Sequence, residues 1–238
     1  MQTHRSFLED IVDESIEMAP LAPRVLDSLL ADGWRLLGYS VIRHNFAVCR
    51  GHICRTIPLR IRLDNGLSFS KSQRQVLRRN ANLQVRWAPI EITPEKKDLF
   101  LSHAKRFNDR QPLSIHSFLN PEAARVPVTG LELNVFDNGR LIACSYIHIG
   151  EHALSGTYCF FDPEYAKKSL GTFTMLLELK AAMEMGKQFY YHGYCYDVPS
   201  EFDYKLNLNN IEAMDWKTGQ WLPQSRVPNV SHKKDSVI

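Results

Sequence analysis

The sequence contains no apolar run of the length that a membrane-spanning helix needs, and no basic start followed by an apolar stretch of the kind that directs secretion. It also contains no internal repeat and no low-complexity segment. Its five cysteines are odd in number and scattered along the chain, at positions 49, 54, 144, 159 and 195. These features predict a cytoplasmic globular protein with reduced thiols and no membrane partner.

Carboxylates are almost missing from one long part of the chain. Residues 33–90 contain eleven lysines and arginines and a single acid, Asp64, whereas residues 1–32 contain seven acids and two cations. The formal net charge of +3 therefore hides a strongly basic segment. Such a segment is typical of a surface that binds a polyphosphate. A solvated basic face, balanced by the acidic N-terminal residues, is the alternative.

The most basic stretch is SFSKSQRQVLRRNANLQVRW, residues 68–87. It contains no carboxylate and five cations: Lys71, Arg74, Arg78, Arg79 and Arg86. Residues 71–81 have the pattern of a short helix, and a serine at position 70 or 72 is a suitable N-cap. Arg74 and Arg78 would then lie one turn apart on the same face, where both can contact phosphate.

The hydrophobic pattern of the whole chain predicts a mixture of helices and strands. We expect helices over residues 21–32, 71–81, 93–109 and 172–186, and strands over parts of 34–63, 83–93, 131–150, 153–161, 188–196 and 202–222. The change of charge and Pro89 place a boundary near residues 88–92. The expected units are a small basic α+β region (residues 1–90), a larger second domain (residues 91–222) and a disordered tail (residues 223–238).

Several stretches resemble the arginyl-tRNA–protein transferase family, including its bacterial leucyl-transferring branch. They are FSKSQRQVLRRNANL, FFDPEYAKKSLGTFTMLLELKAAMEMG and YYHGYCY followed by DYKL, and LLADGWRLLG and IPLRIRL also fit. The resemblance covers roughly residues 15–222. It implies a catalytic half similar to the GNAT acyltransferase fold, a mixed central sheet flanked by helices. It also implies transfer of arginine or leucine from charged tRNA to the N-terminal α-amine of a protein or peptide that begins with Asp or Glu.

The resemblance also suggests roles for individual residues. The aminoacyl ester is already activated, so the enzyme has to align the α-amine, remove one proton and stabilise the oxyanion. Lys205 is the first candidate for holding the oxyanion or the 3′-terminal phosphate, with a solvated surface lysine as the alternative. Tyr191 and Tyr194 are candidates for proton transfer or for contact with the terminal adenosine. Candidate substrate contacts are Asp162, Ser169, Gly171, Thr172 and Tyr204. Candidate tRNA contacts are Lys71, Arg74, Arg78 and Arg79. Core packing of the tyrosines and a turn at Asp162 remain the structural alternatives.

The cysteine motifs depart from the family pattern. The chain reads ESIEM at residues 14–18, where the family usually has a cysteine pair, and only Cys49 and Cys54 remain of the second group. Their C-x4-C spacing is a poor match to common zinc sites. We therefore expect no metal and no cofactor.

Two other functions are compatible with parts of the sequence. A GNAT acetyltransferase would use acetyl-CoA, but its pyrophosphate loop usually contains two glycines where KKSLGT has one, and it would not need the basic segment. A catalytically silent RNA-binding module is the other alternative. The sequence does not indicate the oligomeric state or which amino acid is transferred.

Overall fold

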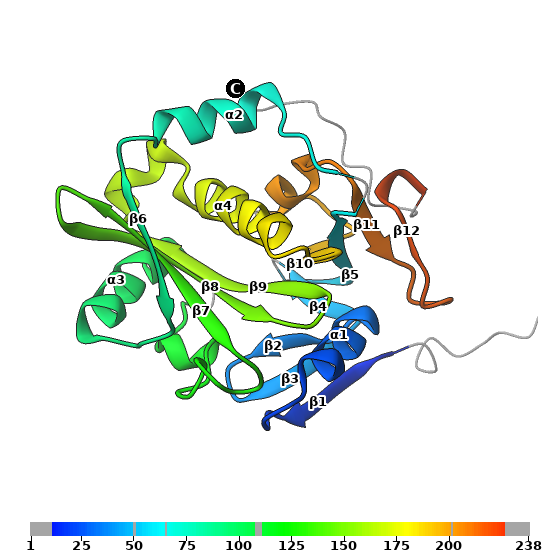
Figure 1. The fold of residues 1–238 in the computed structure, drawn as a ribbon. Helices are drawn as coiled ribbons and strands as arrows, with labels where there is room; N and C mark the ends of the chain where they lie inside the picture. The colour runs from blue at the N-terminus through cyan, green and yellow to red at the C-terminus, as the bar shows by residue number, and fades with distance from the viewer. Residues whose placement is uncertain (1–10, 50, 65, 108–110, 201, 227–238) are drawn as a thin grey trace, which may run out of the picture.

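A large mixed sheet forms the centre of the structure (Figure 1), a computed structural model that describes residues 11–49, 51–64, 66–107, 111–200 and 202–226. The nine-stranded sheet has the order β12-β11-β5-β10-β9-β8-β7-β6, and β4 pairs with β5 outside this path. The strands are β4 (Phe46–Cys49), β5 (His52–Arg62), β6 (Gln84–Pro89), β7 (Gly130–Asp137), β8 (Arg140–Ile149), β9 (Ala153–Phe161), β10 (Phe189–Tyr196), β11 (Ile211–Met214) and β12 (Trp221–Pro223). The pairs within it are antiparallel apart from β9 and β10, which run parallel.

Helices cover both faces of this sheet. Helix α4 (Leu170–Glu184) connects β9 to β10 and lies on one face, with α2 (Lys71–Arg79) packed against it (Figure 1). Helix α3 (Pro94–Ala104) and α1 (Pro23–Ala31) lie on the opposite face. Beside α1 is a small sheet in the order β1 (Asp13–Glu17), β3 (Ser40–His44), β2 (Arg35–Leu37). The protein is thus an α+β structure, with a mixed sheet between helical layers.

Local signals place several of these elements where the sequence predicts them. Thr93 accepts a hydrogen bond from the N–H of Lys96 at the start of α3, with Pro94 in the first turn. Ser70 and Gln73 form a reciprocal capping box at the start of α2. Asn138 and Gly139 both have positive φ angles, 49° and 84°, and they form the tight turn between β7 and β8.

The core is divided between the two faces of the sheet. On one face, apolar side chains of α4 pack on β5 and β10, with Leu176 and Leu179 fully buried. On the other face, Phe100 of α3 packs on Tyr146 and Phe160. Because α4 is sandwiched between the sheet and α2, it is apolar almost all round, and a charged residue on it requires an explanation.

Some predictions need correction or stay open. The loop predicted over residues 162–171 contains a 3-10 helix, η3 (Pro163–Lys168). Residues 33–63, whose alternating pattern predicts two or three short strands, form four, β2 to β5. Strand β5, from the predicted N-terminal unit, lies between β10 and β11 of the predicted second unit. The domain boundary at residues 88–92 stays a prediction, and strands from both sides of it belong to the same nine-stranded sheet. Of the predicted disordered tail, residues 227–238 lie outside the described residues, whereas Trp221–Pro223 is a strand and Gln224–Arg226 a 3-10 helix.

The cysteine pair of the β4–β5 hairpin also differs from expectation. Cys49 and Cys54 are joined by a disulfide, whereas the sequence predicts reduced thiols. Cys144, Cys159 and Cys195 are free. Within the described part of the chain, no three His, Cys, Asp or Glu side chains are grouped as metal ligands would be. None of the described helices is both long enough and apolar enough to cross a membrane.

Candidate active site

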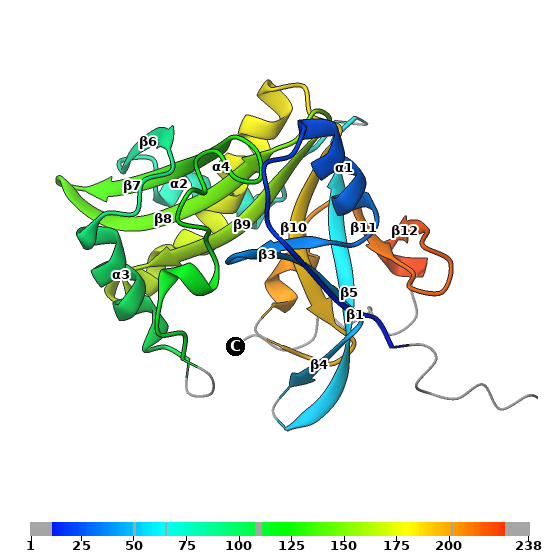
Figure 2. The ribbon, with the colours of Figure 1, turned by 90° about the horizontal axis from the view of Figure 1, so that it is seen from below.

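The two parallel strands of the sheet are hydrogen-bonded neighbours at one end only. Residues 153–155 of β9 pair with residues 189–191 of β10, and beyond this point the strands run apart (Figure 2). A cavity of about 440 Å3 lies where they diverge. Its walls come from β9, β10, α4, the end of α3 and a 3-10 helix, η4 (Asp203–Asn207). Side chains from both faces of the sheet therefore reach one space, which is the usual form of a small-molecule site.

Five of the residues selected from the sequence line this cavity: Ser169, Gly171, Thr172, Tyr204 and Lys205. The first three belong to the start of α4, where the leading backbone N–H groups have no partner within the helix. The Ser169 side chain makes no capping hydrogen bond, so these N–H groups are left for a ligand. The roles assigned to these five residues stay predictions. The fold brings all five residues to the wall of one cavity.

Lys205 is half-buried at the wall of the cavity. Its Nζ lies 4.8 Å from the ring centroid of Phe202 and 3.4 Å from the carbonyl oxygen of Tyr194. Burial lowers the pKa of Lys205 to about 8, because desolvation disfavours the charged form. Gly193 makes room for this amine: it has a φ of +100°, and a Cβ there would lie 3.0 Å from Nζ. The lysine is thus a single, closely fitted hydrogen-bond donor.

Tyr191 and Tyr194, the two tyrosines chosen for proton transfer, lie outside the cavity. Tyr191 is buried on the opposite face of β10, where its hydroxyl accepts a hydrogen bond from Arg60 at 3.3 Å. Tyr194 donates to the carbonyl oxygen of Gly33 at 3.0 Å. Alternate residues of a strand point to opposite faces, so Tyr190 and His192 line the cavity and Tyr191 does not. The pairing of β10 with β5 is irregular between Tyr191 and Gly193, so the alternation does not continue to Tyr194. The roles predicted for Tyr191 and Tyr194 stay predictions, but neither side chain lines this cavity.

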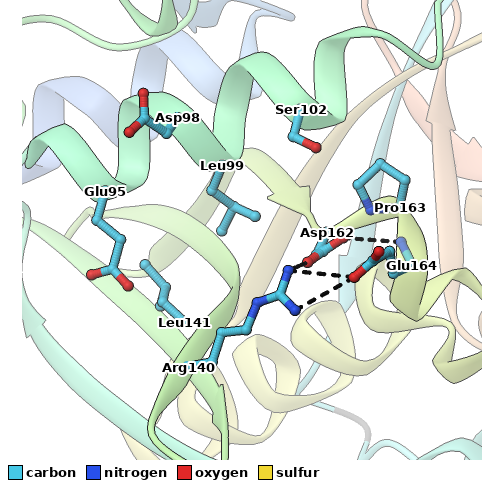
Figure 3. A pocket seen from close by; sticks show the side chains of 9 residues that line it. All are labelled: Glu95, Asp98, Leu99, Ser102, Arg140, Leu141, Asp162, Pro163 and Glu164. Atoms are coloured by element: carbon cyan, nitrogen blue, oxygen red, sulfur yellow. Dashed lines mark hydrogen bonds and ion pairs between the residues drawn. The ribbon is translucent and has the colours of Figure 1, made fainter.

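Asp162 is also placed away from the cavity. It lines a separate pocket of about 390 Å3, together with Glu95, Asp98, Ser102, Arg140 and Glu164, among others (Figure 3). Its carboxylate is buried and forms an ion pair with Arg140, and it accepts a hydrogen bond from the N–H of Glu164 at 3.0 Å. Asp162 thus caps η3 and forms an ion pair with Arg140. A substrate contact at Asp162 stays a prediction, and it would lie outside the cavity between β9 and β10.

The predicted tRNA contacts are exposed on α2. Lys71, Arg74, Arg78 and Arg79 all lie on its surface, while Val76 and Leu77 pack toward the core. The helix is docked beside the start of α4, because Arg79 Nη1 donates to the carbonyl oxygen of Lys167 at 2.8 Å and Asn80 Nδ2 donates to that of Lys168 at 2.9 Å. The basic helix α2 and the lysines at positions 167 and 168 therefore lie beside the segment that leads into α4 and the cavity. Arg79 has a structural contact as well as an exposed charge.

Sequence reasoning missed the carboxylate of the cavity. Glu178 of α4 is only 2% exposed and lines the cavity. Ser145 Oγ of β8 and Tyr190 Oη of β10 donate hydrogen bonds to its two oxygens. Burial raises the pKa of Glu178 to about 7, although both hydrogen bonds act in the opposite direction. The sequence carries one signal for it, a single acid inside the apolar run MLLEL.

The raised pKa of Glu178 predicts a pH-dependent stability. Between about pH 5 and 7 the native state binds a proton that the unfolded chain releases, so the free energy of unfolding should fall as pH rises. The glutamine of Glu178→Gln cannot ionise. Between pH 5 and pH 8 the free energy of unfolding of this variant should therefore fall by about 2–3 kcal/mol less than that of the wild type. Urea unfolding at several pH values measures this. Glu184→Gln, at an exposed position of the same helix, should follow the wild type, and parallel wild-type and Glu178→Gln curves would contradict the prediction.

Two histidines beside the cavity are held neutral. Both ring nitrogens of His192 are buried without a hydrogen-bond partner among the described residues, and burial lowers its pKa to about 3. His103 Nδ1 lies 3.0 Å from the carbonyl oxygen of Phe161, and burial lowers its pKa to about 4. At neutral pH neither ring is charged, so the acidic and basic side chains left to line this space are Glu178, Lys205 and Arg106.

Comparison with known proteins identifies relatives of the chain. The sequence profile described as "Arginine-tRNA-protein transferase, C terminus" matches residues 95–215. An aspartate/glutamate leucyltransferase of Xanthomonas axonopodis pv. citri is 30% identical over 186 residues, 70% of this chain and 69% of that one. One from Campylobacter jejuni is 30% identical over 195 residues, 79% of each chain. The solved structure of L-PGS from Bacillus licheniformis matches with a TM-score of 0.42 and 12% identity, over 59% of this chain and 48% of that chain.

Proposed function

Because this chain belongs to the arginine-tRNA-protein transferase family, we propose that it transfers an amino acid from charged tRNA to the N-terminal α-amine of a protein or peptide that begins with Asp or Glu. The observation that supports this most directly is the cavity between β9 and β10. It gathers the start of α4, Tyr204 and Lys205, and the basic helix α2 lies beside the loop at its edge.

The arrangement of strands supports a GNAT-like acyltransferase fold. Two parallel strands joined by a helix diverge, and the cavity opens between them. We propose that the acyl ester lies in this gap, since both strands can contact an extended ligand there. The acceptor's α-amine would enter the same gap. Transfer would take place in the cytoplasm, where charged tRNA is available.

The reaction requires little more than alignment and charge stabilisation. The α-amine has an ordinary pKa near 7.7–8.0, so part of it is neutral and nucleophilic at neutral pH. Its nitrogen attacks the ester carbon, the oxyanion forms beside Lys205 Nζ, and the bond to the ribose oxygen breaks as that oxygen takes up the proton lost by nitrogen. Donors at Ser169, Gly171 and Thr172 would hold the terminal phosphate of the tRNA at the helix N-terminus.

Label transfer tests the proposed function against its alternatives. The protein is incubated with peptides that begin with Asp, Glu or Ala, and with either labelled aminoacyl-tRNA or labelled acetyl-CoA. We expect label from aminoacyl-tRNA on the acidic peptides. Transfer from acetyl-CoA alone would identify an acetyltransferase, and tRNA binding without transfer from any charged tRNA would identify a silent RNA-binding module.

A further inference from the structure

Glu178 differs from the other buried carboxylates of the described chain. Glu132 is paired with Lys96 and Asp162 with Arg140. Glu178 is as deeply buried, but no basic side chain of the described residues lies within ion-pair distance of it. A buried carboxylate without a cation is costly, so its place on the buried side of α4 points to a partner that comes from outside the chain.

A glycine on β9 accommodates the contact between Glu178 and Tyr190. Gly156 of β9 lines the cavity, and a Cβ at this position would lie 3.1 Å from Glu178 Oε2 and 2.5 Å from Tyr190 Oη. Its φ is not in the left-handed region, so backbone conformation does not require glycine here. The Tyr190 hydroxyl and Glu178 Oε2 thus occupy the place that a side chain at position 156 would need. Ser145 and Tyr190 supply one hydrogen bond to each oxygen, and each oxygen can accept another.

Glu178 and Lys205 stand at opposite ends of one wall of the cavity. Glu178 is held at Tyr190, while Lys205 Nζ lies against Gly193, three residues further along β10. At about 3.3 Å per residue, the two ends are separated by about 10 Å along the strand. His192 lies between them, with its ring nearly parallel to that of Tyr190 at 6.0 Å between centroids. An ester carbonyl at Lys205 thus leaves room for a long side chain to extend toward Glu178.

From these contacts we propose that the Glu178 end of the cavity binds the cationic side chain of the transferred amino acid, so that this chain transfers arginine or lysine in preference to leucine. The inference rests on the proposed function. A guanidinium or ammonium would complete the buried ion pair and use the open lone pairs of the carboxylate. A leucine side chain would leave the buried carboxylate without a cation and without a donor for its remaining lone pairs, which a site built for hydrogen bonding rejects strongly.

The experiment compares transfer from tRNA charged with arginine, lysine or leucine to one peptide that begins with Glu. The wild type should transfer arginine or lysine with a kcat/KM at least about 10²-fold above that for leucine. Glu178→Gln keeps the shape but loses the charge, so it should reduce transfer of the cationic amino acids by about 10²-fold and lower their preference over leucine by at least the same factor. Glu184→Gln is the matched control and should keep the wild-type preference.

Two results would overturn this inference while preserving the proposed function. One is a wild-type preference for leucine. The other is an equal loss for all three amino acids in Glu178→Gln, which would mean that Glu178 binds the common α-ammonium or serves the chemistry instead.

Binding of arginine methyl ester and leucine methyl ester, followed by NMR, tests the subsite without tRNA. Arginine ester binding that Glu178→Gln and Gly156→Ala both weaken by at least about tenfold would support the subsite even if transfer from every charged tRNA failed. That failure would overturn the proposed function alone. Equal binding of both esters, or binding insensitive to Glu178→Gln, would overturn the subsite.

Discussion

Lys205→Ala should lower the single-turnover rate of aminoacyl transfer by about 10²–10³-fold, with little change in affinity for charged tRNA. Loss of one donor to an oxyanion typically costs this much, because the charge develops only in the transition state. The expectation depends on the position of Nζ, which is fitted against Gly193 at the wall of the cavity and is positioned by Phe202 and the carbonyl of Tyr194. Rapid-quench measurement at saturating charged tRNA gives the rate directly.

Two controls make the Lys205 experiment specific. Lys217→Ala removes an exposed lysine that does not line the cavity, so it should keep the wild-type rate. Lys205→Arg keeps a donor but changes its shape and its hydrogen-bond geometry, so only partial recovery is expected. A wild-type single-turnover rate in Lys205→Ala would show that backbone N–H groups hold the oxyanion without this lysine.

Replacing Lys71, Arg74 and Arg78 with glutamine should reduce tRNA affinity by about 10²–10³-fold at low salt. All three are exposed on α2, beside the loop that leads to the cavity. Each lost phosphate contact should also lower the slope of log affinity against log salt by about 1, because fewer counterions are released. The rate at saturating tRNA should change little, since these contacts are made equally in the ground and transition states. Filter binding across a range of salt concentrations measures both effects.

A second triple variant separates local contacts from net charge. Lys97, Arg125 and Lys217 are also exposed and carry the same total charge, but they lie outside α2. Their replacement by glutamine should leave most of the affinity and the salt slope intact. Equal losses in the two triple variants would mean that overall charge, and not the α2 surface, binds tRNA. Arg79 is excluded because it also docks α2 through the carbonyl of Lys167.

Much of the secondary structure could be predicted because its causes are local. The capping residues Ser70 and Thr93 and the Asn138-Gly139 turn act on backbone groups within a few residues of themselves, so a short stretch of sequence contains all the necessary information. The basic stretch and the long motifs also identify the family without a structure, because the resemblance depends on residue order alone.

The site itself was only partly predictable, because its parts come from distant segments. Lys205, Tyr204 and the start of α4 were found as motifs, and folding brings them to one cavity. The choice between Tyr190 and Tyr191 could not be made from the sequence. Either tyrosine could face either side of the sheet, because the neighbouring residues of this strand are also aromatic. The pairing of β10 with β5, which is irregular between Tyr191 and Gly193, determines which tyrosine faces the cavity.

The sequence by itself determined the basic segment, the principal helices and hairpin, and the family, since charge, capping and motif order are properties of the chain. Only the tertiary structure decided which charges are paired. Asp162 meets Arg140 across a distance of 22 residues in sequence and is thereby occupied, whereas Glu178 receives its hydrogen bonds from β8 and β10 and no cation from the described chain. Burial and pairing depend on which surfaces pack together, and the cost of an unpaired buried charge then sets what the cavity can bind.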